Sequence, residues 1–370
     1  MKASRQSGKK LETFCGRCHT PLAVENGRIP FKHPLKKRGD TKVDRVSAEG
    51  VGCDFCHTIT GHTRLANAGF VFKASRDKGG PLVDAIPRSH GARHAPYFRS
   101  AELCGTCHQV VHPSNGIPLE TTYSEWKASP YAKAGIVCQD CHMTDGLDGG
   151  TGPNNLGKPR RNPGKAAIMG NKRPHISRHH FVGPNLIFAQ GPEAAAMRKA
   201  SEALLRRAGT VDIGEPKQDK GAVSIPVIVT NTGAGHYLPT GVTEIRQLWL
   251  EVKVTGARGR VLLHSGGLDA AGNIKPGAVI YRTEVHDASG KDTTLFWNTV
   301  RKASDRRIPP LSSLTEQYVL QKGARGKVRV EAALHYRSVS PAGLAEAEVP
   351  PGTVTVPVFT IARSKRTLTL

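Results

Sequence analysis

The stretch GIVCQDCHMTDG, residues 135–146, places two thiols and an imidazole within five positions, at Cys138, Cys141 and His142. A turn-forming Asp-Gly pair follows almost directly. Two cysteines and a histidine this close together can hold zinc, exchange a disulfide or attach a haem. The other cysteines of the chain discriminate between these three kinds of site.

All eight cysteines fall in C-x-x-C pairs that are followed at once by histidine. The pairs are Cys15 with Cys18, Cys53 with Cys56, Cys104 with Cys107, and Cys138 with Cys141, and the histidines are His19, His57, His108 and His142. C-x-x-C-H is the attachment signature of c-type haem, in which both thiols bind the porphyrin and the histidine binds the iron. Zinc explains the cysteine pairs but not the repeated histidine, and a thioredoxin-like site needs a single reactive pair. The pattern predicts four covalently attached haem c groups, with zinc as the alternative.

Each iron needs a sixth ligand or keeps an open position for chemistry. Methionine is scarce, whereas the first half of the chain has eight non-motif histidines, at His33, His62, His90, His94, His112, His175, His179 and His180. This supply favours bis-histidine haems, which suit electron transfer. The candidate distal ligands are His62, His90, His94, His112, His179 and His180. If its segment is helical, His112 points the same way as His108 and can serve only a neighbouring haem.

His236 stands apart, in the Gly-rich stretch NTGAGHYLPTG between two predicted strands. It is interpreted either as a turn residue or as a ligand or propionate contact for a haem, including a haem of another subunit.

Two domains and a linker are predicted, in an α+β fold. Residues 1–188 form a loop-rich tetrahaem domain with short helices, one of them at 121–135, and this domain folds around its haems. Residues 189–219 form a helical linker, whose helix at 191–209 has its apolar stripe at Met197, Ala200 and Leu204, with Leu205 as a possible further member. Residues 220–370 form an antiparallel β-sandwich, because apolar residues alternate over 223–229, 248–254, 328–336 and 354–358.

The net charge is +23, and basic residues cluster at 32–45 and 158–178. Haem propionates would neutralise part of this charge, and the remainder would attract an acidic redox partner or an anionic surface. No nucleic-acid-binding motif accompanies the charge, so nucleic acid is not an expected partner. No apolar run is long enough for a transmembrane helix. Haem c is attached outside the cytoplasm, so a periplasmic or extracellular location is expected, although no signal peptide is visible in this numbering.

The stretches TFCGRCHTPLA, GVGCDFCHTITGH, ETTYSEWKASPYA and GAGHYLPTG together resemble the tetrahaem cytochromes of the cytochrome c-554-like group, in particular those with an appended β domain. The resemblance covers residues 1–188 and mainly 223–255 of the second domain. It implies multihaem electron transport outside the cytoplasmic membrane. Some similar proteins polymerise into extracellular filaments in which the next subunit supplies one histidine ligand.

The sequence therefore leaves three possible roles for the protein to be tested. The first is an electron-transfer protein, not an enzyme, whose partners are other redox proteins or copies of itself. The second is a multihaem oxidoreductase that acts on a small nitrogen or sulfur species at one open iron. The third, compatible with the first, is assembly through the β domain into a polymer or surface layer.

Overall fold

The structure is a computed structural model that describes residues 11–29, 49–150, 152, 154–187, 189, 191–219, 221–321 and 323–370. The chain forms two compact units. Unit 1 comprises residues 1–124, 137–139 and 161–177, and unit 2 comprises residues 125–136, 140–160 and 178–370. Short segments before residue 160 therefore group with the C-terminal strands. The predicted domain boundaries at residues 188 and 219 stay a prediction.

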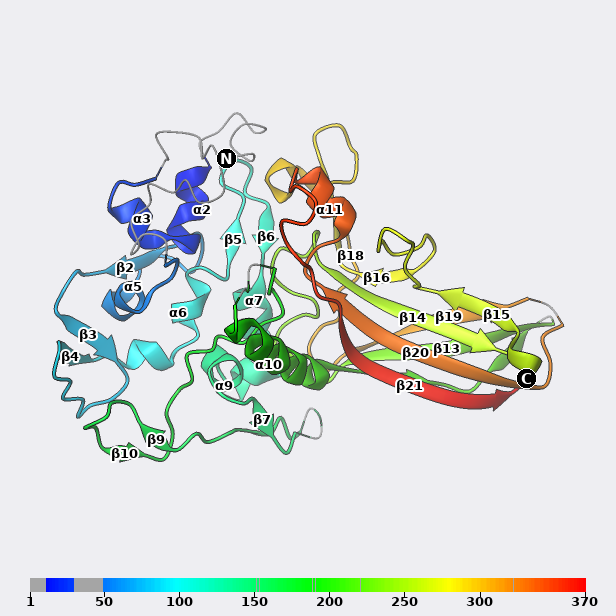
Figure 1. Cartoon of the computed structure of the whole chain (residues 1–370), viewed down its shortest axis with the longest axis horizontal. Coiled ribbons are helices and arrows are strands. Elements are labelled where there is room, and N and C mark those ends of the chain that lie inside the picture. The colour runs from blue at the N-terminus through cyan, green and yellow to red at the C-terminus, as the bar shows by residue number, and fades with distance from the viewer. Residues whose placement is uncertain are drawn as a thin grey trace. The chain divides into compact units, whose positions relative to one another are not determined.

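Unit 1 consists of short helices and two-stranded ribbons joined by loops (Figure 1). Its helices are α2 (Glu12–His19), α3 (Pro21–Glu25), α5 (Cys53–Thr58), the 3-10 helix η1 (Pro96–Arg99) and α6 (Glu102–Gly105). Its strands pair as β1 (Ile59–His62) with β2 (Phe70–Phe72), β3 (Asp77–Gly80) with β4 (Gly91–His94), β5 (Val110–Val111) with β6 (Pro118–Glu120), and β9 (Gly164–Lys165) with β10 (Lys172–Arg173). Elements this short bury little apolar surface by themselves.

Unit 2 contains two larger antiparallel sheets. In the first, one edge of β13 (Ala222–Asn231) pairs with β11 (Gly209–Ile213) and β12 (Lys217–Asp219), and the other edge pairs with β19 (Ser313–Leu320). In the second, the order is β15 (Val261–Ser265), β14 (Gln247–Thr255), β20 (Lys327–Arg337) and β21 (Phe359–Thr369), and β14 also pairs with β16 (Val279–Tyr281). Smaller ribbons join β7 (Leu147–Asp148) to β8 (Lys158–Pro159) and β17 (Thr283–His286) to β18 (Arg301–Asp305).

The helices of unit 2 are mostly short. They are α8 (Pro130–Lys133), α10 (Glu193–Ala208), α11 (Pro341–Glu346) and the 3-10 helices η2 (Ala257–Gly259) and η3 (Phe296–Asn298). Helices α7 (Thr122–Lys127) and α9 (Cys138–His142) each begin in unit 1 and end in unit 2.

The two large sheets share one core. The alternating residues Val223 to Val229 of β13 and Leu248 to Val254 of β14 are almost fully buried and belong to the same cluster of core side chains. Burying each such side chain contributes about 1.5–3 kcal/mol. In unit 1, by contrast, the described core is a small cluster around Phe55, Ile59 and Phe70. The two-residue period predicted for these strands is confirmed.

Two sequence-based expectations about element boundaries are wrong in detail. The helix predicted at 121–135 is split into α7 and α8, because Pro130 begins a new first turn, with Ser129 as its N-cap. The strand predicted at 354–358 is absent from those described residues, where Pro357 lacks the N–H that a ladder requires, and β21 begins at Phe359 instead. The residues from Arg363 to Arg366 are all polar, so a search for alternating apolar residues does not detect β21.

Helix α10 occupies almost the predicted range, but its buried face is different. Ser201, Leu205 and Ala208 are buried, whereas Met197 is 43% exposed. The stripe predicted through Met197, Ala200 and Leu204 is therefore shifted by about one position, roughly 100° around the helix, to the side of Leu205, which the prediction counted as a possible member. Helix α10 packs against β21.

In the described part of the chain, no helix combines the length and the apolar character needed to cross a membrane. His33 and the first basic cluster, residues 32–45, lie outside the described residues.

Candidate haem-binding sites

All four C-x-x-C-H motifs lie on short helices or directly after one. They are found on α2, on α5, at the end of α6 and on α9. Cysteines three positions apart on a helix lie on one face, which is the arrangement needed to bind two neighbouring vinyl groups. None of the eight cysteines forms a disulfide, and Cys53 is exposed while the others are half-buried. The donor set therefore fits haem c. Among the described residues, no three His, Cys, Asp or Glu side chains group as a protein metal site does.

Two motif histidines are oriented by backbone carbonyl groups. Nδ1 of His57 lies 2.6 Å from the carbonyl oxygen of Gly79, and Nδ1 of His142 lies 2.7 Å from that of Val182. A carbonyl oxygen only accepts hydrogen bonds, so Nδ1 carries the proton in both rings and Nε2 is the unprotonated nitrogen. Metal-binding histidines typically have such a partner, which fixes the tautomer and the ring orientation. In both rings Nε2 is therefore the nitrogen that could bind a metal ion.

His108 of the third motif has a carboxylate partner. Its Nδ1 lies 3.1 Å from Oε1 of Glu120 on β6. This hydrogen bond raises the pKa of His108, although solvent weakens the effect because 66% of the side chain is exposed. A carboxylate partner fixes the same tautomer and makes the ring a stronger donor to a metal. The side chain of His19, in the first motif, is exposed.

Within unit 1, the third motif lies beside the first and the start of the fourth. The thiols of Cys18 and Cys107 are hydrogen-bonded, as are those of Cys104 and Cys138. The hydrogen bond from Cys18 lowers the pKa of Cys107 to about 7. Cys18 and Cys107 also pack against the apolar cluster around Phe55 of the second motif. The first three motifs therefore converge on one small core.

Five of the predicted distal histidines have exposed side chains, namely His62, His90, His94, His179 and His180. His62 stacks on Tyr97 with ring centroids 5.7 Å apart, and its Nδ1 lies 3.0 Å from the tyrosine hydroxyl group. Nδ1 of His90 lies 2.8 Å from the Gly91 carbonyl oxygen. The pairing of these histidines with particular haems stays a prediction.

His112 is buried and has the opposite tautomer. Its Nδ1 accepts a hydrogen bond of 3.2 Å from the Ser114 backbone N–H, which places the proton of the neutral ring on Nε2. His175 is similar, because its Nδ1 accepts a 3.0 Å hydrogen bond from the Asn162 N–H. Iron binding through Nε2 would require either ring to change partner. The prediction for His112 therefore gains no support from its hydrogen bonds.

In unit 2, the fourth motif lies close to the loop between β13 and β14. The imidazole rings of His142 and His236 are nearly parallel, with centroids 6.3 Å apart and planes inclined by 16°. Both side chains are half-buried. The sequence singles out His236 through the stretch GAGHYLPTG, but only the fold brings it beside His142.

Hydrogen bonds from core residues hold this loop. Asn231, which is fully buried, donates to the carbonyl oxygens of His236 (2.9 Å) and Ile308 (3.0 Å). Its side-chain oxygen accepts from Ala234 N–H at 3.0 Å. Leu238 and Ile308 also exchange backbone hydrogen bonds of 2.9 and 3.0 Å. The backbone on both sides of His236 is therefore fixed.

A buried ion pair adds a second restraint, which the sequence does not reveal. Glu125 of α7 accepts hydrogen bonds from Tyr237 N–H (3.1 Å), from the Thr240 hydroxyl group (2.7 Å) and from Arg307. The Arg307 guanidinium lies over the Tyr237 ring at 5.0 Å and donates two 2.9 Å hydrogen bonds to Asp305. The side chains of Glu125 and Arg307 are each only 5% exposed. We call these five residues the clamp.

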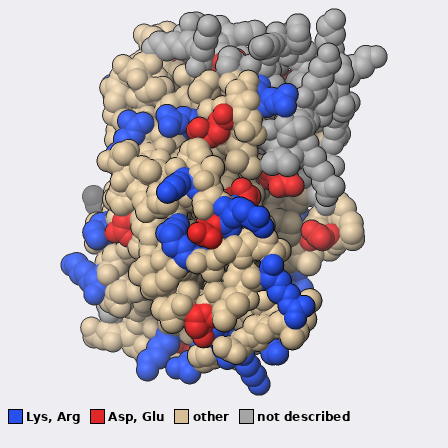
Figure 2. Space-filling view, turned by 90° about the vertical axis from the view of Figure 1, so that its left-hand side faces the viewer, with Lys and Arg blue, Asp and Glu red and all other residues tan. Residues whose placement is uncertain are grey.

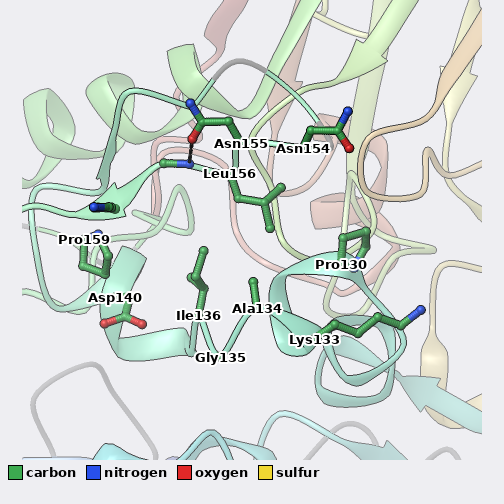
Figure 3. Close-up of a pocket in the computed structure, with 12 residues that line it drawn as sticks. Pro130, Lys133, Ala134, Gly135, Ile136, Asp140, Asn154, Asn155, Leu156 and Pro159 are labelled. Carbon is green, nitrogen blue, oxygen red and sulfur yellow. Dashed lines mark hydrogen bonds between the residues drawn. The ribbon is translucent and has the colours of Figure 1, made fainter.

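A cavity of about 630 Å³ lies beside α8 in unit 2 (Figure 3). Leu156 points into it toward Ile136, and Asn155 accepts a 3.1 Å hydrogen bond from Gly157 N–H at its rim. Asp140 also lines the cavity. Asp140 lies on a different face of α9 from Cys141, so this cavity is not on the thiol side of the fourth motif.

A second cavity of about 550 Å³ lies within unit 1. Its walls are mainly apolar, from Pro81 to Val83, and it also contains His94, Arg99 and His175. Arg173 lines it as well and forms a 2.5 Å ion pair with Asp84. Apolar walls with nearby arginines suit a flat apolar group that carries carboxylates.

Lysine and arginine side chains are spread over the face shown in Figure 2, with acidic residues between them. In the second basic cluster, residues 158–178, several charges are neutralised by ion pairs, namely Arg160 with Asp148 (2.5 Å), Arg173 with Asp84 (2.5 Å) and Arg178 with Asp145 (3.0 Å). The cluster is therefore less positive than its sequence implies.

The fold of the chain is similar to that of a solved multihaem cytochrome. This structure is a penta-heme cytochrome c552 from Thermochromatium tepidum, with a TM-score of 0.63 and 19% identity over 96% of this chain and 83% of that chain. A thioester domain of the Enterococcus faecium TIE86 protein aligns over 50% of this chain and 54% of that one, at 9% identity and a TM-score of only 0.16. No family model and no curated protein matches the sequence.

Proposed function

We propose that this protein is a tetrahaem c-type cytochrome that carries electrons. The observation that carries the proposal is that all eight cysteines lie in four C-x-x-C-H motifs on or next to short helices, in a chain with the fold of a multihaem cytochrome. Each motif would attach one haem through its two thiols and bind the iron through its histidine. The similar solved structure is a penta-heme cytochrome, whereas the four motifs of this chain set the number of haems that we propose.

The spacing of the motifs supports electron transfer between haems. Direct thiol contacts join Cys107 to Cys18 and Cys104 to Cys138, so the third haem would be attached beside the first and the fourth. Because these thiols touch, the haems attached to them would lie close together, as stepwise electron transfer requires. Haems with two histidine ligands have no open position for substrate, which favours this role over catalysis.

Several finer proposals accompany this function. The two sheets that share one core would be the predicted β-sandwich. The apolar cavity of unit 1, which Arg99 and Arg173 line, would hold one porphyrin and its propionates. The net charge of +23 would favour an acidic redox partner. Location outside the cytoplasm follows from haem c attachment. Assembly into filaments stays a prediction from the resemblance alone.

The test is the visible spectrum of the dithionite-reduced protein, recorded before and after addition of carbon monoxide, together with the covalent haem content. We expect four haems per chain and c-type bands that carbon monoxide does not change. A shift in about one quarter of the haem would indicate one open iron among four and favour the oxidoreductase alternative. Absence of haem bands from a correctly exported preparation would refute the proposed function.

A further inference from the structure

We propose that His236 is the sixth ligand of the iron bound by His142, so that both histidine ligands of the fourth haem come from unit 2. This inference rests on the proposed function and adds a specific ligand to it. The ring centroids of the two histidines are 6.3 Å apart, and the ring planes are within 16° of parallel. An ion between two opposed imidazoles, at about 2.0–2.1 Å from each ligating nitrogen, places the centroids about 6–6.5 Å apart. The observed separation matches this value.

Ring stacking does not account for the same geometry. Atoms in van der Waals contact lie about 3.5–4.0 Å apart. At a centroid distance of 6.3 Å, nearly parallel imidazoles cannot overlap face to face. Face-to-face stacking therefore does not explain the near-parallel orientation.

The hydrogen bonds of both rings match those of metal ligands. Nδ1 of His142 donates to the carbonyl oxygen of Val182 at 2.7 Å, and Nδ1 of His236 donates to that of Tyr237 at 2.9 Å. Each neutral ring therefore has its proton on Nδ1 and its lone pair on Nε2. A pair of ligands on one iron needs this tautomer in both members, whereas His112 and His175 have the opposite one.

The surroundings of His236 are also those of a fixed ligand. Gly235 packs so closely on Tyr131 of α8 that a Cβ at this position would lie 3.3 Å from the ring. The Tyr131 hydroxyl group donates to the Thr232 carbonyl oxygen at 3.4 Å, and the clamp holds the residues after His236. A ligand held on both sides loses little conformational freedom when it binds, which favours a permanently six-coordinate iron.

The test uses the full-length, haem-loaded protein and the variant His236→Ala. We expect the wild type to bind no carbon monoxide at this haem. In the variant, about one quarter of the haem should become high-spin and bind carbon monoxide, because one of the four irons loses a ligand. Added imidazole should restore the six-coordinate spectrum. If the variant keeps four haems and none of them binds carbon monoxide, the inference is wrong.

The matched control is His264→Ala. His264 lies in the same unit, on β15, and pairs with Glu251 at 2.9 Å on a partly exposed surface. This change should leave every haem six-coordinate. If both variants expose a similar fraction of haem to carbon monoxide, the effect on His236 is unspecific and the inference fails.

A second variant keeps the test decisive if His236→Ala does not accumulate. His236→Met retains a potential ligand, and histidine/methionine ligation raises the reduction potential of a haem. One haem of the four should then titrate at a higher potential and show the charge-transfer band of methionine ligation. An unchanged set of four potentials would overturn the inference while the proposed function stands, whereas a wild type without covalent haem would refute the function itself.

Discussion

Replacement of Arg307 by methionine should strongly destabilise the protein, because it leaves a buried charge without its partner. Arg307 and Glu125 are each only 5% exposed, and Arg307 also binds Asp305. Removing one member of a buried ion pair typically costs about 3–5 kcal/mol. Glu125 would retain hydrogen bonds from Tyr237 and Thr240, which favours the lower end of that range. Arg307→Met should therefore lower the free energy of unfolding by about 3 kcal/mol.

The assay is urea-induced unfolding of the haem-loaded protein, followed by circular dichroism and by the haem absorbance. The control is Arg329→Met, since Arg329 and Glu331 form an ion pair in which both side chains are more than one third exposed. Loss of such a pair costs about 0–1 kcal/mol. A double variant that also replaces Glu125 by leucine should be less destabilised than Arg307→Met, because the unpaired charge is gone. Equal effects of the two arginine substitutions would refute the reasoning.

Three further predictions concern pH, the support of the fourth motif and haem content. Burial raises the pKa of Asp305, but hydrogen bonds from its cationic neighbours outweigh burial and hold it at about 2. This lowered pKa should stabilise the folded protein by roughly 2 kcal/mol. The stabilisation is complete above pH about 4 and is lost as the pH falls through about 2. The difference in stability between wild type and Asp305→Asn should therefore shrink over that range when the unfolding midpoint is titrated with acid. Ser201 donates a 2.8 Å hydrogen bond to the carbonyl oxygen of Gly183, which follows Val182, the partner of His142. Ser201→Ala should lower the free energy of unfolding in urea by about 1 kcal/mol. No measurable loss would contradict a role for this hydrogen bond in supporting the fourth motif. Replacing Cys138 and Cys141 together by alanine should reduce the haem content from four to three by mass spectrometry, and an unchanged content would exclude the fourth attachment site.

Local chemistry explains why the sequence predicts the attachment sites so directly. A C-x-x-C-H motif brings thiols and imidazole together within five residues, and a single helical turn is sufficient to align them. The core strands are also predictable from the sequence, because every second residue from Val223 to Val229 is apolar and buried. The pattern of alternating apolar residues fails for β21, because polar residues form much of this strand. Its backbone pairing with β20, rather than an apolar pattern, makes it a strand.

The sequence by itself determined the number and identity of the candidate haem attachments, the alternation in the central strands and the position of α10. Only the tertiary structure decided which face of α10 is buried, which carbonyl groups orient His57 and His142, and that His236 lies beside His142. The physical reason is that haem attachment and strand alternation depend on neighbours in sequence. A distal ligand and a buried ion pair such as Glu125 with Arg307 depend on distant segments meeting in space, and no local pattern encodes such a meeting.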